Sequence, residues 1–490
     1  SVFSTEKNRE GIQVGTAIAM MERLPLKRLK AEAQPYSPIA QVSFRHWWGK
    51  EKRAELVESL ERPRAATQIK PTPKLGLPFV PIGKSDYFES WPLLTELIPS
   101  SFPGVKTSRD EGLVDISLPN LKDKIAAYFD SSISDSVLAK REPKLMKKTK
   151  RYDPRSIREH LSKRGAIADN FVLFAYRPFD VRWLYWEPET KLLDEKRTEY
   201  FTHAKSHPWT LVTQLKPRRD WSPPVLIRQL GCIDLFDRSA SCFPSHISSA
   251  SSEDDGTADL FTPTLPTGPQ PNLTDFARDY LAQLACAPED LFFHLVAVLH
   301  SPRYREENAG ALRQDWPRVP LPKDATTLRA GAALGRQLAA LLDPETPVPG
   351  VTDLKVRDDL KGLGELTVSA ADGKQKADPD LALTARWGYA GQKGVTMPGP
   401  GKVSTGTRGE GYLDIHLNET TRWKDVPEPV WKYTLGGYQV LKKWLSYREA
   451  TLLGRPLTSD EALQFTRNVR RITAILALSA QLDSHYAKSV

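Results

Sequence analysis

Cysteine is scarce in this chain, and its few cysteines form no recognisable motif. Cys232, Cys242 and Cys286 make no Cys-x-x-Cys pair and have no metal-binding spacing with histidine. We therefore expect neither a disulfide framework nor a zinc site, and this usage is typical of a reducing cytoplasm. No glutamate or cysteine lies at a ligand spacing from His203 and His207, so we interpret both as surface histidines.

Long apolar runs are absent as well. The most apolar stretch, residues 291–300, is too short to span a membrane and contains His294. The N-terminal residues lack the apolar region of a secretion signal. We expect a soluble cytoplasmic protein without a membrane partner. Its 490 residues suffice for several domains with cores of their own, so folding needs no cofactor.

Familiar catalytic motifs are also missing. The sequence has no P-loop, no His-Glu-x-x-His, no nucleophile elbow and no Gly-x-Gly-x-x-Gly after a predicted strand. Trp221–Val225 superficially resembles the loop that holds a flipped base in amino-methyltransferases, but Val225 offers no aromatic ring for the base to stack on. We assign no catalytic residue and no cofactor-binding residue to this chain.

Basic residues outnumber acidic ones, 69 to 60, which gives a net charge of +9 and suits a polyanionic partner. The excess is strongest in residues 141–164, where ten Lys and Arg face three Asp and Glu. Such runs also form solvated helix faces, and both interpretations stay open. The candidate phosphate contacts in this run are Lys147, Lys148, Lys150 and Arg151.

Aromatic and arginine residues alternate at strand-like spacing in residues 174–201. The candidates for base stacking are Tyr176, Phe179, Trp183, Tyr185 and Trp186, and those for phosphate or guanine contacts are Arg177, Arg182 and Arg197. Aromatic residues also fill sheet cores, and an arginine beside a tryptophan often only packs its own stem. The segment therefore predicts either a nucleic-acid surface or a structural core.

Glycines are dense in residues 388–411, where backbone N–H groups could converge on a phosphate. Flexible hairpin loops have the same composition. Lys402 and Arg408 are the candidate DNA contacts in this segment.

The remaining chain is predicted from its periodicity and its turn residues. Residues 11–24 are typical of a buried strand, residues 50–61 of an amphipathic helix, and the four prolines of residues 70–84 forbid long regular elements. Residues 248–272 are polar and proline-rich, which predicts an exposed linker or surface loop.

Helices are expected in the C-terminal half. The apolar spacing predicts them over residues 272–285, 288–300 and 325–342. Short strands and turns follow over residues 350–430. A last helix begins with a capping box from Thr458 to Glu461, and one of its faces carries Phe465, Val469, Ile472 and Leu476.

Several stretches together resemble the C-terminal part of type ISP restriction-modification enzymes and related adenine-specific DNA methyltransferases. The stretches are residues 11–23, 103–116, 175–186, 192–201, 291–322 and 436–465, and they follow the order of that family over nearly the whole chain. The resemblance implies a mixed α/β (α+β) fold. Residues 1–62 would end an α/β methyltransferase-like domain, and residues 63–247 and 273–490 would form a two-lobed target-recognition domain with a helical C-terminus.

The resemblance implies sequence-specific recognition of double-stranded DNA, with further candidate contacts at Lys106, Thr107 and Arg109. In the family, an S-adenosylmethionine-binding glycine motif, an NPPY-type loop, a nuclease and a helicase-like motor precede this region, and none is visible here. We therefore expect a fragment, a split subunit or a truncated chain that is inactive alone. Its partners would be DNA and upstream methyltransferase and motor domains or subunits, and S-adenosylmethionine would bind only to the complete enzyme.

Two alternatives stay open. The chain is a catalytically silent module whose basic surface docks a methyltransferase or motor subunit, or it is an active methyltransferase by itself. The first predicts a flat salt response of DNA binding together with retained binding to a protein partner, and the second predicts methyl transfer by the isolated chain.

Overall fold

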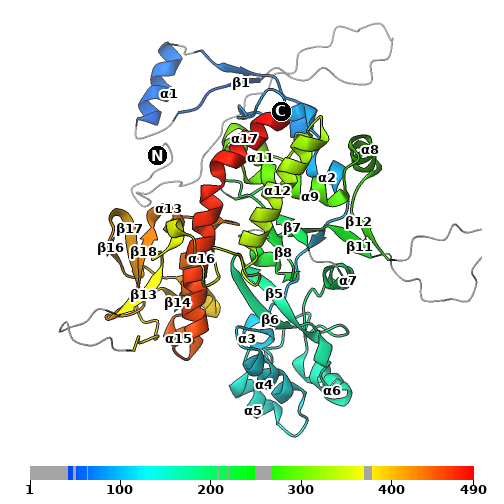
Figure 1. The fold of residues 1–490 in the computed structure, drawn as a ribbon. Coiled ribbons are helices and arrows are strands. Elements are labelled where there is room, and N and C mark those ends of the chain that lie inside the picture. The colour runs from blue at the N-terminus through cyan, green and yellow to red at the C-terminus, as the bar shows by residue number, and fades with distance from the viewer. Residues whose placement is uncertain are drawn as a thin grey trace, which may run out of the picture. The chain divides into compact units, whose positions relative to one another are not determined.

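The computed structural model describes residues 42–47, 51–62, 65–206, 209–218, 220–237, 239–248, 268–368 and 378–490. The chain divides into two compact units, Ser1–Lys84 and Ser85–Val490 (Figure 1). The predicted strand at residues 11–24 lies outside the described residues, as does most of the predicted linker at residues 248–272.

The described residues of the first unit include a pair of strands and an α-helix. Strand β1 (Val42–Phe44) pairs antiparallel with β2 (Thr67–Ile69), and helix α1 (Lys52–Glu61) lies between them in the chain. This helix confirms the prediction for residues 50–61. Val57 and Leu60 on α1 are 55% and 79% exposed. Their apolar side chains are thus without a core in the part of this unit that the structure describes.

The aromatic segment forms the central hairpin of the first large sheet. Strand β5 (Phe171–Arg177) pairs antiparallel with β6 (Asp180–Tyr185), which in turn pairs with β4 (Val114–Asp115). β5 also pairs in parallel with β9 (Leu230–Gly231). Helices drawn in cyan lie beside this sheet in Figure 1: α3 (Asp110–Leu113), α4 (Leu118–Phe129), α5 (Asp135–Arg141) and α6 (Pro154–Arg164).

A second sheet is covered by helices. It is antiparallel and consists of β3 (Phe102–Pro103), β10 (Ser241–Pro244), β7 (Thr210–Thr213) and β8 (Val225–Ile227). Helices α9 (Pro288–His300) and α12 (Ala325–Leu342) pack against each other, and α12 also contacts β8. At Gly335 of α12 the backbone of Phe293 is so close that an added Cβ would lie 1.9 Å from its carbonyl oxygen. Glycine therefore permits this helix pair.

The second unit contains further described elements. They are α2 (Leu94–Leu97), α7 (Thr198–Ser206), β11 (His246–Ser248), β12 (Pro269–Pro271), α8 (Asp275–Leu284), α10 (Pro302–Glu307), α11 (Ala309–Leu312) and α17 (Ser479–Ser489). β11 and β12 pair with each other, and α17 packs against α9, α10 and α12.

A third antiparallel sheet, yellow to orange in Figure 1, consists of β13 (Glu365–Val368), β18 (Thr421–Pro427), β17 (Gly409–His416) and β16 (Val403–Gly406). Helix α16 (Ser459–Ala477) contacts β13 and β18, with Phe465 stacked on Trp423 at 4.1 Å between ring centroids. The neighbouring elements are β14 (Gly388–Ala390), β15 (Thr396–Pro398), α13 (Glu428–Trp431), β19 (Thr434–Leu435), β20 (Tyr438–Gln439), α14 (Val440–Ser446) and α15 (Ala450–Leu453).

The structure confirms the mixed helix and sheet content. Helices α8, α9 and α12 lie within the predicted ranges, and residues 70–84 contain no long element. The capping box of α16 is present: the backbone N–H of Glu461 donates to Thr458 Oγ1, and that of Thr458 donates to Glu461 Oε2. Val469 and Ile472 are buried with Phe465 on the predicted face, while Leu476 is only half-buried.

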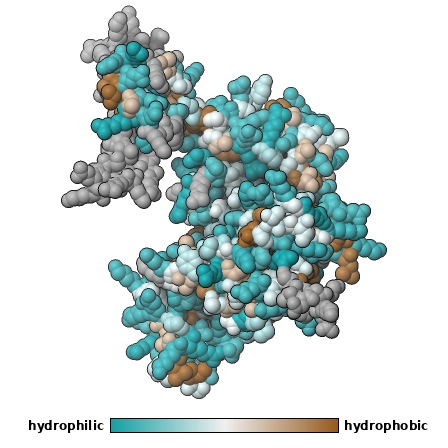
Figure 2. Space-filling view, turned by 90° about the vertical axis from the view of Figure 1, so that its left-hand side faces the viewer, coloured by the Kyte–Doolittle hydropathy of each residue, from teal (hydrophilic) through white to brown (hydrophobic). Residues whose placement is uncertain are grey.

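The surface shown in Figure 2 is mostly hydrophilic, with apolar side chains scattered in small groups. Among the described residues, no single helix has the length and apolar character that a membrane span requires, although the bent pair α8 and α9 meets those criteria together.

Candidate nucleic-acid interface

The lysine-rich part of the basic run lies in the loop between α5 and α6, not on a helix face. Tyr152 anchors this loop, because its buried hydroxyl donates to the Leu145 carbonyl and meets the Tyr128 hydroxyl at 2.9 Å. Lys147 and Lys150 are exposed, and neither makes a hydrogen bond or ion pair with the residues that the structure describes. The anchored loop thus presents two uncompensated positive charges.

The other two cations of this loop have protein partners. Lys148 Nζ lies 2.5 Å from Asp153, the residue that caps α6, and the Arg151 guanidinium lies 3.5 Å from Asp194. Both side chains are exposed, so these surface ion pairs are weak and can exchange for a phosphate.

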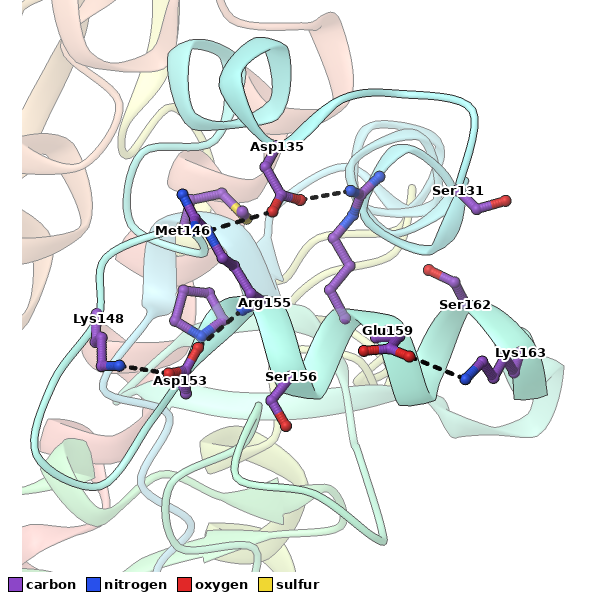
Figure 3. A pocket seen from close by; sticks show the side chains of 12 residues that line it. Ser131, Asp135, Met146, Lys148, Asp153, Arg155, Ser156, Glu159, Ser162 and Lys163 are labelled. Carbon is purple, nitrogen blue, oxygen red and sulfur yellow. Dashed lines mark hydrogen bonds and ion pairs between the residues drawn. The ribbon is translucent and has the colours of Figure 1, made fainter.

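A groove of about 1020 Å³ lies beside this loop, lined by residues between Ser131 and Lys163 (Figure 3). Its cations are matched by carboxylates: Lys148 by Asp153, Lys163 by Glu159 at 3.0 Å, and Arg155 and Arg158 by Asp135 at 3.6 and 2.7 Å. Because its charges are nearly balanced, the groove is a poor anion site compared with the loop that carries Lys147 and Lys150.

The predicted contacts at residues 106–109 differ in their surroundings. Lys106 is half-exposed and lies 3.8 Å from Glu195. Thr107 is buried and donates to Asp110. Arg109 is only 6% exposed, donates from Nε to the Leu192 carbonyl at 2.8 Å and stacks on Tyr152 at 3.9 Å. Burial lowers the pKa of Arg109. In this structure Thr107 and Arg109 hold the protein together, so we withdraw them as DNA contacts.

Most aromatic rings of the segment at residues 174–201 are not free to stack on bases. Tyr176, Phe179, Tyr185 and Trp186 are buried, and Trp186 stacks on Phe201 at 3.7 Å between ring centroids. The structural interpretation of these rings is therefore correct for this structure. The consecutive residues Phe174, Ala175 and Tyr176 are all buried, as are Leu184 and Tyr185, so both faces of the hairpin are covered at these positions. Trp183 is half-buried.

The arginines of this segment are engaged with protein groups. Arg182 pairs with buried Asp180 at 2.7 Å, and Arg177 donates to the Tyr176 carbonyl at 2.6 Å. Arg197 donates to Glu195 and is partly exposed. Burial raises the pKa of Asp180, but Arg182 and Arg448 lower it by more, to about 2.

Four residues that sequence reasoning missed pack beside Arg177, Arg182 and Asp180. They are Tyr438, Lys443, Tyr447 and Arg448, contributed by β20, by α14 and by the link to α15. Their alternation of tyrosine with cations repeats the composition of residues 176–182, and this signal could have indicated them.

The glycine-rich segment does not form the predicted phosphate cradle around Arg408. The Arg408 N–H and the Thr407 hydroxyl both donate to the Asp425 carboxylate, at 2.9 and 2.6 Å. A protein carboxylate thus fills the turn between β16 and β17. The Arg408 side chain is exposed and donates to the Lys361 carbonyl, whereas the exposed side chain of Lys402 makes no hydrogen bond or ion pair with any described residue.

One of the two histidine assignments changes. His203 is buried, and its Nδ1 accepts from the Ser248 N–H at 3.1 Å, so the surface interpretation was wrong for it; His207 lies outside the described residues. The described residues contain no cluster of His, Cys, Asp and Glu fit to hold a metal ion.

Residues 221–225, which superficially resemble a base-holding loop, are buried. His300 Nε2 contacts the Pro224 carbonyl at 2.8 Å, which gives that segment a structural role.

One family model matches the chain: the Type ISP C-terminal specificity domain, over residues 96–472. No curated protein sequence matches. Similar solved structures include a nuclease-deletion mutant of the Type ISP restriction-modification enzyme LlaGI in complex with a DNA substrate mimic, at 15% identity and a TM-score of 0.50 over 89% of this chain. A DrdV–DNA complex is similar at 20% identity and a TM-score of 0.54 over 88% of this chain.

A third similar structure is the ATP-dependent Type ISP restriction-modification enzyme LlaBIII bound to DNA, at 14% identity and a TM-score of 0.52 over 88% of this chain. The chain spans 38%, 42% and 26% of LlaGI, DrdV and LlaBIII, so it corresponds to less than half of each. At these identities the likeness shows a shared fold. The family match covers about three quarters of the sequence, and the chain belongs to the family of Type ISP C-terminal specificity domains.

Proposed function

We propose that this chain is the specificity region of a type ISP-like restriction-modification enzyme and that it recognises a sequence in duplex DNA. The observation that carries the proposal is the anchored loop between α5 and α6, which presents the side chains of Lys147 and Lys150 without partners among the described residues. Family membership and the DNA present in the three similar structures support it.

The proposed phosphate contacts are the exposed or half-exposed cations of three loops. They are Lys106, Lys147, Lys148, Lys150, Arg151, Lys402 and Arg408. Contacts with phosphates set the position of a protein on DNA, and contacts with base edges set its specificity. An adenine methyltransferase rotates its target base out of the duplex, and a separate recognition surface that grips the flanking DNA assists this.

We further propose that residues 1–62 close a methyltransferase-like domain and that residues 63–247 and 273–490 act as two recognition lobes. Exposed Val57 and Leu60 on α1 support the first part, because apolar helix faces normally pack against a core. The same face supports a second candidate function, docking onto a methyltransferase or motor subunit.

The direct test of the proposed function is selection from a pool of random duplexes by the purified chain. We expect one short sequence to be enriched, and each altered base pair in it to cost about 1–3 kcal/mol of binding free energy. Binding without enrichment would contradict specific recognition and favour the docking function. Incubation with DNA and labelled S-adenosylmethionine tests catalysis separately, and we expect no methyl transfer by the isolated chain.

A further inference from the structure

Two arginines of hairpin β5–β6 and one lysine of α14 lie among tyrosine rings in a single cluster. The Arg182 guanidinium lies between Tyr176 and Tyr447, 4.0 and 4.3 Å from their ring centroids. Arg177 lies 4.2 Å from the ring of Tyr176, and Lys443 Nζ lies 4.5 Å from that of Tyr447. Stacking fixes the directions of these cations, so little ordering entropy is left for a ligand to overcome.

Part of the cluster reaches solvent, and Lys443 lies close to two other cations. Arg177, Lys443 and Tyr447 are each half-buried, whereas the Arg182 side chain is only 11% exposed. The pKa of Lys443 is lowered to about 8, first by burial and then by Arg177 and Arg182, while Asp180 raises it by less. The nearby cations are thus not fully compensated at the lysine.

Two carboxylates beside the cluster, those of Asp180 and Asp110, already have partners. Asp180 accepts from Arg182 and from Arg448, and Asp110 accepts from Tyr176 and Thr107. Asp234, the third nearby acid, contributes its backbone carbonyl to the Tyr438 hydroxyl.

Donors remain without acceptors. Arg177 Nε is buried and has no partner among the described residues, and Lys443 Nζ makes one hydrogen bond, to the Thr396 carbonyl at 3.3 Å. Buried donors are nearly always paired, so an unpaired Nε beside a lysine with a single hydrogen bond favours a bound anion. The groove of Figure 3 differs in this respect, because its cations are matched by carboxylates.

We propose that Arg177, Arg182 and Lys443 bind one phosphate group of the DNA backbone. This inference rests on the proposed DNA recognition, and it deepens it by adding a half-buried, preorganised contact to the exposed loop lysines. A tetrahedral phosphate offers several acceptor oxygens, which suits single donors that approach from different elements. Arg182 keeps its Nε and Nη2 on Asp180 and contributes its positive charge.

The test compares Lys443→Met with Lys442→Met, the matched control on the same helix. Lys442 is half-buried and has no hydrogen bond or ion pair within the described residues. Two quantities are measured for each folded variant: the slope of log affinity against log salt for duplex DNA, and the melting temperature in inorganic phosphate relative to chloride at equal ionic strength.

We expect Lys443→Met to reduce the salt slope by about one and to abolish a phosphate-specific stabilisation of about 2 °C. Lys442→Met should retain both, and Lys443→Arg should restore both. Retention of both effects in folded Lys443→Met overturns the site. Should this variant not fold, Lys443→Gln with unaltered slope and phosphate response overturns it equally.

The two measurements separate this inference from the proposed function. Loss of the phosphate response with an unchanged DNA slope would overturn the DNA backbone as the source and leave a free phosphate as ligand. A chain that binds no DNA but loses its phosphate response in Lys443→Met would contradict the proposed function and support the anion site.

Discussion

Asp180 and Arg448 are joined by a buried ion pair: Arg448 Nη2 lies 2.8 Å from Asp180 Oδ1, although 268 residues separate them in the sequence. Asp180 begins β6, and Arg448 follows α14. The pair therefore ties the aromatic hairpin to the C-terminal elements that supply Lys443 and Tyr447.

Removing Arg448 should strongly destabilise the fold. Arg448→Met leaves Asp180 buried with only Arg182 as partner, and we expect a loss of about 3 kcal/mol in the free energy of unfolding. Urea denaturation measures it. The control is Arg455→Met, which breaks the more exposed pair of Arg455 with Glu461 and should cost below about 1 kcal/mol. Equal losses for the two variants would contradict the buried role of Arg448.

Arg109 should stabilise the protein without contributing to DNA binding. A lysine at this position lacks the Nε–H that bonds the Leu192 carbonyl, so Arg109→Lys should cost about 2 kcal/mol in urea denaturation. The salt slope of DNA binding should stay unchanged. A reduced slope with unchanged stability would restore Arg109 as a DNA contact.

Acid should destabilise the protein through buried histidines. Burial lowers the pKa values of His294 and His300 to about 3. At a pH between about 3 and the ordinary histidine pKa of about 6.5, the unfolded chain binds more protons than the folded chain. The free energy of unfolding therefore falls as the pH falls through about 6.5.

These two histidines together should remove about 3 kcal/mol of unfolding free energy between pH 7.5 and 5.5. Urea denaturation across this range checks it. His300→Gln retains a donor for the Pro224 carbonyl and should reduce the pH dependence by about half. An unaltered pH dependence in this variant would refute the assignment.

Gly335 should reject the alanine that helices usually prefer. Gly to Ala within a helix normally stabilises by about 1 kcal/mol, but the new Cβ would collide with the Phe293 carbonyl. We expect Gly335→Ala to destabilise the chain by about 2 kcal/mol in thermal or urea unfolding. The control Ala333→Gly, at an exposed position of α12, should cost about 1 kcal/mol. Stabilisation by Gly335→Ala would show that α9 and α12 are not in close contact.

Local sequence signals predicted local structure well. The helix predicted over residues 325–342 is α12 with the same bounds, because its apolar spacing and the side-chain cap from Asp324 act within a few residues. The capping box at Thr458 succeeded for the same reason.

Contacts between distant segments were not predictable from such signals. Arg109 was predicted to be a phosphate contact, but its burial depends on carbonyl groups at Lys191 and Leu192, more than 80 residues away. His203 is buried because β11 lies over it, and nothing near His203 in the sequence indicates that. The lysines of the anchored loop were predictable as exposed charges. The packing of Arg177 and Arg182 against Tyr438 and Tyr447 was not, because it joins segments far apart in the sequence.

The most direct test of the account is the salt dependence of duplex binding by the intact chain. We expect log affinity to fall linearly with log salt, and the double variant Lys147→Ala, Lys150→Ala to reduce the slope by about 1.8, since each lysine neutralises one phosphate. Lys432→Ala, which removes a lysine paired with Glu428, should leave the slope unchanged. A flat salt response of the wild-type chain, or a double variant that binds with the same slope, would contradict DNA recognition by this loop.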